Sequence, residues 1–575
     1  IVRINLSFVT KMNPPATPPP STRILSFRPK LFECLRGYSR ERFLVDLLAG
    51  LTVGIVALPL AIGFGIAAGA TPGAGIFTAI IGGFIVSALG GSRVQIGGPA
   101  GAFVGLVYMV IVQYGMPNLL LCTAMAGVFL FILGAARLGS LIKFVPHPIT
   151  TGFTCGIAIT IISTQVKDFF GLKLDPVPAS FLEKAVALGR ALPTLSWATV
   201  AIGVGAFVLI KLWPKAWARR VPGSIIAIIV GTLVVSLLKL PVETIGERFG
   251  DNGIPHGWPA FHLLSFDWQH LGGLIRPAVA IALLGSIESL LSAVVADGMI
   301  DDRHDSNQEL MAQGIANFVV PFFGGIPVTG VLARTAVNVR NGARAPIAGM
   351  VHSLTLLLIV LLAAPLAKFI PLTVLGAVLI VVSLQMGEWD EFLLLRRQTK
   401  SDAVVFLVTF VLTVVFDLSV AVEIGMVLAA FLFVKRVADT TQVSAHDDEN
   451  GAAGQGHERV ENLPSGVLVY RVFGALMFGA ADKLDTVMRR ANADTRVVIL
   501  HLAALTALDG TALNALDTLQ EKLHRHGRHL VLSGPHTQPY ALMEKMGFLE
   551  RVGRDNVVAD LDAAVARASR LLEQK

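Results

Sequence analysis

Charged side chains are scarce in this sequence. They make up 15% of its 575 residues, whereas soluble domains carry about 25%. Hydrophobic residues account for 54%, and the mean hydropathy is +0.67. This balance excludes an ordinary soluble protein and predicts an α-helical polytopic membrane protein.

Cysteine is also rare. Cys34, Cys122 and Cys155 are too few for a disulfide scaffold, and we expect them to be reduced. No Walker motif, zinc-ligand spacing or nucleophile elbow is present. The sequence therefore predicts no enzyme, no metal site and no cofactor. The net charge of +7 does not indicate nucleic-acid binding, because most basic residues fall in short segments between apolar stretches.

Long apolar stretches are what the sequence has instead. A membrane-spanning helix needs about 20 apolar residues. On this criterion we expect fourteen spans in two halves of seven. They lie near residues 45–69, 71–91, 97–114, 118–136, 149–166, 196–213, 222–240, 274–296, 308–323, 328–341, 345–368, 370–387, 402–418 and 419–437.

The basic residues between these spans predict the topology. Lys and Arg are enriched in cytoplasmic loops. With a cytoplasmic N-terminus, the inner loops hold most of the basic residues, and the outer turn at 115–117 carries no charge. Both termini are therefore expected in the cytoplasm. The residues on which this depends are Arg93, Arg137, Lys143, Lys211, Lys215, Arg219, Arg220, Arg340, Arg344, Arg396, Arg397, Lys400, Lys435 and Arg436.

The composition divides the chain into four parts. Residues 1–40 are expected to be a cytoplasmic segment, disordered in part because Pro14–Pro20 is rich in proline. A transmembrane domain over 41–437 is followed by a polar linker at 438–462 and a soluble domain at 463–575.

The soluble domain has an alternating pattern of strands and helices, which predicts an α/β fold. Asp509-Gly510-Thr511 lies between a strand and a helix. One reading makes Asp509 or Thr511 the helix N-cap, and the other makes Thr511 a phosphorylation or nucleotide-sensing position. The expected strands are Gly466–Phe473, Thr495–Leu502 and His529–Ser533, and the expected helices are Asp482–Ala491, Thr511–His526 and Pro539–Met546.

Two segments interrupt the apolar stretches at corresponding places in the two halves. QIGGPAGAFVGLV contains Pro99, and GGIPVTGVLARTAVN contains Pro327. Irregular backbone inside a membrane is tolerated only within protein or beside a water-filled cavity. Paired breaks of this kind are typical of inverted-repeat transporters with a site at the repeat interface. If each proline begins a half-helix, two helix N-termini form an anion site; the alternative is ordinary glycine-rich helix packing.

Two ionisable residues lie inside predicted spans. Glu288 is surrounded by apolar residues and is expected to face the interior, either to carry a coupled proton or to pair with a neighbouring helix. Ser286 and Ser289 either bond to it or bond back to their own helix. Arg334 follows the second break, where it attracts an anion, pairs with Glu288 or reaches the cytoplasmic interface.

These residues resemble the sulfate permease (SulP) family of anion transporters, which includes the animal motor protein prestin. The resemblance rests on PLAIGFGIAAGATPGAGIFTAIIGGFIVSALGGSRVQIGGPAGAF, on ALLGSIESLLSAVVADGM and on HDSNQELMAQGIANFVVPFFGGIPVTGVLARTAVNVRNGARAPIAG. The C-terminal region resembles a STAS domain. Together they cover nearly the whole chain from about residue 40.

The resemblance implies two inverted repeats of seven spans, a core and a gate domain, and a homodimer. It places the anion between the first, third, eighth and tenth segments, and it makes Glu288 the coupling carboxylate. Proton-coupled members carry Glu at this position, and sodium-coupled bicarbonate members carry Asp. The site residues carried over by motif position are Phe64, Gly98, Pro99, Ala100, Thr329, Gly330, Val331, Leu332, Ala333 and Arg334.

The chain departs from the family pattern at two places. Leu60 stands where a glutamine commonly follows the first-segment proline, here Pro59. Asp509-Gly510-Thr511 departs from the Asp-Ser pattern that related STAS modules phosphorylate. The first-segment polar contact and regulation by phosphate are therefore not carried over.

The sequence thus predicts a multi-pass transporter of the inner membrane that carries sulfate, bicarbonate or a small dicarboxylate with a proton by alternating access. A sodium-coupled bicarbonate symporter is the alternative within the class. A channel or voltage-responsive motor is a rival of another class, and it would need no coupling carboxylate. The expected partners are the anion, the coupling proton or sodium, the bilayer and a second copy of the chain.

Overall fold

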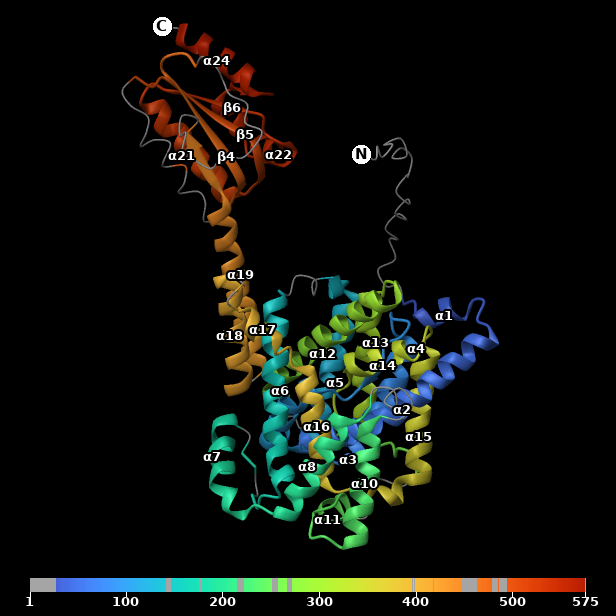
Figure 1. Cartoon of the computed structure of the whole chain (residues 1–575). Coiled ribbons are helices and arrows are strands. Elements are labelled where there is room, and N and C mark those ends of the chain that lie inside the picture. The colour runs from blue at the N-terminus through green and yellow to red at the C-terminus, as the bar shows by residue number, and fades with distance from the viewer. Residues whose placement is uncertain are drawn as a thin grey trace, which may run out of the picture. The chain divides into compact units, whose positions relative to one another are not determined.

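The computed structural model describes residues 27–573, except 141–145, 175–176, 179, 215–221, 251–256, 266–270, 396, 398, 417, 446–462, 478–483 and 485–493. The chain divides into two compact units, residues 1–425 and 426–575, and the boundary falls within helix α19. Each unit is described by itself (Figure 1).

The first unit is built of helices with two very short strands. Its first half contains α1 Lys30–Leu35, α2 Arg40–Ala67, α3 Pro72–Phe77, a π-helix η1 Thr78–Gly82, α4 Gly83–Leu89, β1 Gly97–Gly98, η2 Gly101–Phe103, α5 Val104–Ala135, α6 His147–Phe170, α7 Phe181–Ala191, η4 Leu192–Thr194, α8 Trp197–Leu212, α10 Gly223–Leu238 and α11 Ile245–Phe249. Its second half contains α12 Leu271–Ile300, α13 Ser306–Val319, η5 Val320–Phe323, β2 Thr329–Gly330, α14 Leu332–Arg340, α15 Ile347–Ala367, α16 Leu372–Met386, α17 Asp390–Leu394, α18 Lys400–Val415 and the start of α19 Leu418–Thr440.

Seven helical stretches of the described residues are long and apolar enough to cross a membrane, or up to 8 if one bent pair counts as a span. The protein is therefore a multi-pass membrane protein. Helices lie in each of the ranges expected from hydropathy, but the ranges 97–114 and 118–136 join in α5. A kink separates them at Gly115, whose φ of 82° suits glycine, two residues before Pro117.

Glycine lets α5 and α13 pack closely (Figure 1). A methyl group on Gly314 would lie 2.5 Å from the backbone nitrogen of Phe131, and one on Gly127 would lie 2.7 Å from the backbone oxygen of Gly314. Apolar side chains have no preference for each other over lipid tails, so helices in membranes associate through such close backbone contact. The backbones of α5 and α13 therefore approach closely because Gly127 and Gly314 have no side chains.

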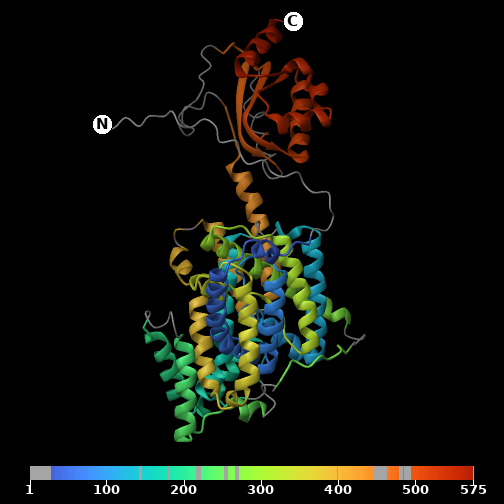
Figure 2. The same ribbon diagram turned by 90° about the vertical axis from the view of Figure 1, so that its right-hand side faces the viewer.

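The second unit is a five-stranded sheet covered by helices on both faces (Figure 2). The strand order is β3-β4-β5-β6-β7, with β3 antiparallel and the other pairs parallel. Alternate residues of β5 face the two sides: Leu500 packs in the cluster of α21, and Ile499 in the cluster of α24. The elements are β3 Gln442–Ala445, β4 Val467–Leu476, β5 Val497–Leu508, α21 Gly510–Arg525, β6 His529–Ser533, α22 Thr537–Lys545, α23 Phe548–Val552, η7 Arg554–Asn556, β7 Val557–Val558 and α24 Leu561–Glu573.

The α/β pattern expected for this unit is confirmed, with one difference. The range 438–462, expected to be a polar linker, contains the end of α19 and strand β3, because Gln442–Ala445 pairs with the edge of β4. The rest of that range lies outside the described residues, as does nearly all of the expected helix Asp482–Ala491. Asp509 is the N-cap of α21 and accepts the Ala512 N–H at 2.8 Å, which confirms the capping reading.

Replacement of Gly314 by valine should destabilise the membrane unit by about 1–3 kcal/mol, because the new side chain overlaps the α5 backbone. Gly298→Val on α12 is the matched control, since nothing lies within 4 Å of a methyl group there. Thermal melting of both variants in detergent measures the difference. Equal melting temperatures for the two variants would contradict this account of α5–α13 packing.

Candidate functional site

The two interrupted segments meet and pair with each other. Strands β1 and β2 run antiparallel, with Gly97 opposite Gly330 and Gly98 opposite Thr329. The Val331 N–H continues the pairing by donating to the Ile96 carbonyl at 2.8 Å. Backbone groups that a broken helix exposes inside a membrane need partners. Here each broken segment supplies hydrogen-bond partners for the backbone of the other, although the two are more than two hundred residues apart. The paired strands β1 and β2 are called the crossing below.

Helix α14 holds the first segment in place. The Thr335 hydroxyl accepts the Ile96 N–H at 3.0 Å, and the Asn338 amide donates to the Val94 carbonyl at 2.9 Å. All of these groups are buried. A polar side chain from the second half therefore replaces a helical hydrogen bond that the first segment has lost.

The second segment is held by side chains of η1 and α13. Asn317 binds both backbone polar groups of Val328. Its amide nitrogen donates to the Val328 carbonyl at 2.7 Å, and its amide oxygen accepts the Val328 N–H at 2.9 Å. The Thr78 hydroxyl accepts the Ile326 N–H at 2.8 Å. Thr78 lies in the π-helix η1, an irregularity that is frequent at functional sites.

Neither proline begins a helix, so that part of the expectation is wrong. Pro99 lies two residues before η2, which leads into α5, and Pro327 lies five residues before α14. The reason is the strand pairing, which occupies the residues beside each proline before a helix can start. Two helix N-termini do follow the crossing. Their N-cap residues, Ala100 and Val331, make no side-chain cap, so the first-turn N–H donors are not satisfied in that way.

Arg334 lies against the crossing. It is 1% exposed, and its Nε, Nη1 and Nη2 have no hydrogen-bond partner among the described residues. Its guanidinium lies over the backbone of Gly98, where a methyl group would overlap Nη1. A buried charge without a partner is strongly unfavourable, so this unpaired guanidinium is the strongest candidate for a ligand contact at the site.

The geometry separates the three readings of Arg334. No ion pair joins it to Glu288 within the described residues, and its burial excludes a position at the membrane interface. What remains is a positive charge directed at β1. The close approach requires glycine at position 98.

His352 was not found from the sequence. It is buried on α15, and its Nε2 has no hydrogen-bond partner among the described residues. A methyl group on Gly83 would lie 2.8 Å from the Gly97 carbonyl and 3.5 Å from His352 Cε1, so the imidazole packs near the first segment. The sequence did contain a signal for His352, because it is an ionisable residue within an apolar span. The same signal identified Glu288.

Glu288 lies on α12 between two residues that bind the crossing. The Thr329 hydroxyl donates to the Gly285 carbonyl at 3.0 Å, and the Gln95 amide donates to the Ser289 hydroxyl at 2.9 Å. The Glu288 side chain is half-buried, and its Oε2 is buried without a hydrogen-bond partner in the described part of the chain. The carboxyl group is therefore not neutralised by a structural partner.

The two serines beside Glu288 differ. Ser286 donates to the Leu283 carbonyl at 2.7 Å, so it bonds back to its own helix. Ser289 instead accepts from Gln95 and from Gln313, at 2.9 and 3.1 Å. Neither serine holds the Glu288 carboxyl group.

A buried polar chain extends from Ser289, and the sequence reasoning missed it. Gln313 donates to Ser289 and also to Glu309 Oε1 at 3.3 Å. Glu309 Oε2 accepts the N–H groups of Gly91 and Ser92 at 2.8 and 3.1 Å. This chain connects α12 and α13 to the turn that precedes the first segment, and it fixes that turn.

Apolar residues also surround the β1–β2 crossing. Phe64, Ala100 and Val331 belong to one buried cluster. A methyl group on Gly101 would lie 2.6 Å from Ile161 Cδ1 and 3.4 Å from Phe64 Cε1. Leu332 is 43% exposed, and Ala333 is exposed as well, so these two predicted residues lie outside the packed interior.

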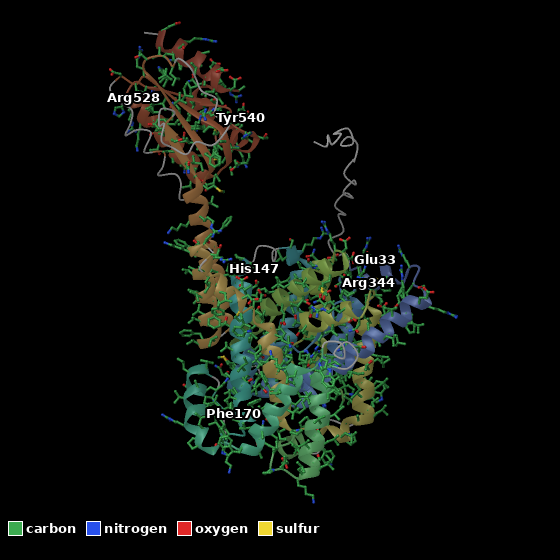
Figure 3. The ribbon with its side chains drawn as sticks, in the orientation of Figure 1. Glu33, His147, Phe170, Arg344, Arg528 and Tyr540 are labelled. Atoms are coloured by element: carbon green, nitrogen blue, oxygen red, sulfur yellow. The ribbon has the colours of Figure 1, made fainter. Side chains whose placement is uncertain are left out.

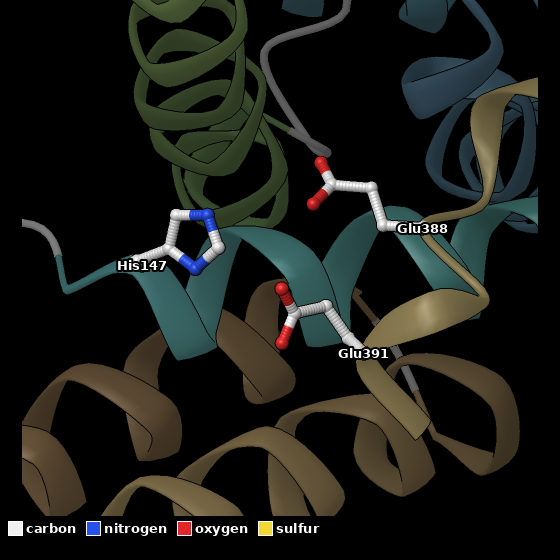
Figure 4. Close-up of side chains that lie close together, drawn as sticks. All are labelled: His147, Glu388 and Glu391. Atoms are coloured by element: carbon white, nitrogen blue, oxygen red, sulfur yellow. The ribbon is translucent and has the colours of Figure 1, made fainter. Parts of the chain in front are cut away.

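One further group of side chains has metal-ligand chemistry. Figure 4 shows His147 facing Glu388 and Glu391. His147 begins α6, Glu388 precedes α17, and Glu391 lies within α17; their ligand atoms lie within 4.8 Å of one another. Such donors suit a divalent transition metal. His147 and Glu388 are exposed to solvent. Acidic groups commonly gather at exposed positions without an ion, so this group remains a surface cluster outside the crossing.

The helices and the crossing define a helical membrane transporter. A profile described as the sulfate permease family matches residues 43–409, and one described as the STAS domain matches residues 461–564. The chain therefore belongs to the sulfate permease family of anion transporters, and it is a transporter, not an enzyme.

Relatives and solved structures agree with this assignment. The chain is 37% identical to YvdB of Bacillus subtilis, named for sulfate transport, over 91% of this chain and 97% of that protein. It is 28% identical to the bicarbonate transporter BicA of Picosynechococcus, over 91% and 94%. The transmembrane domain of a cyanobacterial BicA superposes with a TM-score of 0.59 at 28% identity, covering 68% of this chain and 98% of that one. Murine Slc26a9 shares the fold, with a TM-score of 0.82 at 19% identity over 94% of each chain.

Arg334→Ala should weaken anion binding by about 1.5–3 kcal/mol, the contribution of a hydrogen bond to a charged group. Arg340→Ala is the control, because Arg340 is exposed at the other end of the same helix. Titration calorimetry with sulfate and bicarbonate in detergent gives both affinities. Unchanged affinity in Arg334→Ala would assign this arginine to structure alone.

Proposed function

We propose that this protein is a secondary active transporter that carries a small oxyanion together with a proton by alternating access. The substrate class comprises sulfate, bicarbonate and small dicarboxylates. The observation that carries the proposal is the buried Arg334 guanidinium, which has no partner among the described residues and lies on the backbone of the β1–β2 crossing.

The crossing has the chemistry of an anion site. A helix N-terminus carries about half a positive charge and free N–H donors. Two such termini, those of η2 and α14, follow the paired strands. Together with Arg334, they would hold an anion among the proposed ligands Gly98, Pro99, Ala100, Phe64, Thr329, Gly330, Val331, Leu332 and Ala333. Such a site recognises charge and size, which fits relatives named for both sulfate and bicarbonate transport.

Glu288 is the proposed coupling group. Its carboxyl group is placed between the two α12 residues that bind the crossing, and it has no structural partner in the described part of the chain. An apolar environment favours the protonated form of a carboxyl group, so binding and release of a proton can follow the conformational cycle. Sodium coupling is the second candidate, since the family resemblance links sodium coupling to bicarbonate members and two relatives are named bicarbonate transporters.

We further propose fourteen spans in two inverted repeats, a core and a gate domain, and a homodimer. The paired breaks of β1 and β2 support the repeat, since each interrupts a helical half at the same place. The basic residues support cytoplasmic termini and an inner-membrane location. The proposed parts are residues 1–40, the transmembrane domain 41–437, the connection 438–462 and the cytoplasmic STAS domain 463–575.

Uptake of radiolabelled anions into proteoliposomes tests this function. A proton-coupled transporter concentrates the anion when a pH gradient is imposed and does not need sodium. Concentration that depends on a sodium gradient instead would assign the alternative symport. Uptake that only equilibrates the anion under both gradients would contradict active transport and indicate a channel.

Glu288→Gln should abolish concentrative uptake under a pH gradient while the anion affinity changes less than about threefold. The amide cannot change its charge during the cycle, but it keeps the size of the side chain. Glu388→Gln, at an exposed carboxylate, controls for loss of one negative charge. If Glu288→Gln still concentrates substrate, another group carries the proton.

Removal of the chain after Arg436 should leave a membrane unit that binds anion, because every proposed ligand lies before residue 426, where the second unit begins. Anion-induced thermal stabilisation in detergent measures binding, since a ligand stabilises only the state that holds its site. A truncated protein that stays monodisperse but shows no shift with an anion that stabilises the full chain would contradict this separation.

A further inference from the structure

Lys184 is buried without a counter-charge. It lies on α7, is 4% exposed and forms no ion pair among the described residues. Lys184 Nζ lies over the ring of Tyr108, 5.7 Å from the ring centroid. Removing an ammonium group from water is costly, and an aromatic face returns only part of that cost. The Lys184 ammonium group is therefore available to a ligand of opposite charge.

The Lys184 side chain lines a cavity of about 460 Å³. This cavity, called the Lys184 cavity below, lies between α5, α6, α7 and the end of α18. Its polar lining includes the hydroxyls of Thr160, Thr164 and Ser180, and Glu183 lies on it as an exposed carboxylate. The walls of α5, α6 and α18 contribute no charged side chain to it.

The start of α7 adds donors to this cavity. Ser180 is the N-cap of α7 and makes no side-chain cap, so its hydroxyl does not take up the first-turn N–H groups beside Lys184. Thr160 and Thr164 donate their hydroxyl protons to backbone carbonyls of α6, at 3.1 and 2.7 Å. Positive charge and donors are thus concentrated on α7, where an anion would bind.

The α7 wall of the cavity lies toward one end of α6. Figure 3 places His147 and Phe170 at opposite ends of α6, and α7 follows the Phe170 end. In the proposed topology this end faces away from the cytoplasm. A ligand in the Lys184 cavity would therefore come from outside the cell.

The inner end of the cavity reaches the candidate anion site. Gly101 and Ala102 line it, and they directly follow Ala100 of the crossing. Ile161 and Phe64 close around Gly101, at 2.6 and 3.4 Å from the place of a methyl group. Ile161 and Phe64 thus form the contact between the Lys184 cavity and the crossing.

We propose that the Lys184 cavity is a second binding site for the small oxyanion, which occupies it on the outer side before it passes Phe64 and Ile161 to reach Arg334. The proposal rests on the proposed function, because the ligand is the transported anion. Lys184 and the first turn of α7 bind it, and the hydroxyl-lined wall of α6 keeps it hydrated. The exposed Glu183 carboxylate at the same turn opposes multiple occupancy.

The first test measures uptake from the outer side for Lys184→Met, with the exposed Lys173→Met as the matched control. Loss of one charge-assisted contact should raise KM for sulfate or bicarbonate at least about tenfold, with kcat within about twofold. Lys184→Arg should restore KM. An unchanged KM in Lys184→Met, or the same increase in Lys173→Met, overturns the proposal. Wild-type vesicles that take up no anion would instead contradict the proposed function.

The second test does not depend on turnover. Lys184→Cys, labelled from outside with a membrane-impermeant anionic thiol reagent, should react above the level of the wild-type cysteines and should be protected by the transported anion. Protection by the anion supports a bound ligand even if Lys184→Met is poorly folded. Labelling at the same rate with and without anion overturns the proposal.

Discussion

A helix that breaks inside a lipid bilayer exposes N–H and C=O groups that water cannot reach, and this constraint governs the arrangement of the membrane unit. The chain meets it by bringing two breaks together as β1 and β2. Thr335, Asn338, Thr78 and Asn317 then satisfy the backbone on either side. The first turns of η2 and α14, which follow the paired strands, carry N–H donors that no N-cap side chain satisfies, and these donors are the basis of the proposed anion site.

The glycines of the crossing, Gly98 and Gly330, are as important to its geometry as the polar side chains. Arg334 can lie on the backbone only because position 98 is glycine, and Gln95 reaches Ser289 across Gly330 for the same reason. A methyl group at either position would overlap the long side chain above it. Glycine here serves close approach and not a special backbone angle, since neither residue has a positive φ.

The sequence predicted the positions of the helices because long apolar stretches carry a strong signal, and the glycine–proline breaks marked the crossing. It also predicted an N-cap at Asp509 or Thr511, and Asp509 fills that position, since a capping residue acts within its own turn. It failed where the outcome depends on distant partners. The prolines do not begin helices because strand pairing intervenes, and β3 forms only because the edge of β4 is available. His352 and the chain from Gln95 to Glu309 were missed, because a lone polar residue in an apolar span does not reveal its partner.

Glu288 and Arg334 are an acidic and a basic residue near the same crossing, yet no ion pair joins them in the described part of the chain, and the proposed cycle depends on this separation. A paired arginine would have its field cancelled, and a paired glutamate would stay ionised at all relevant pH values. Left apart, the guanidinium would hold the anion and the carboxyl group would carry the proton in the proposed cycle. An anion bound at the crossing adds negative charge near Glu288 and so strengthens its hold on a proton, which links the two ligands through electrostatics alone. Because this coupling is reciprocal, loss of the proton on the far side weakens the anion's binding there and promotes its release.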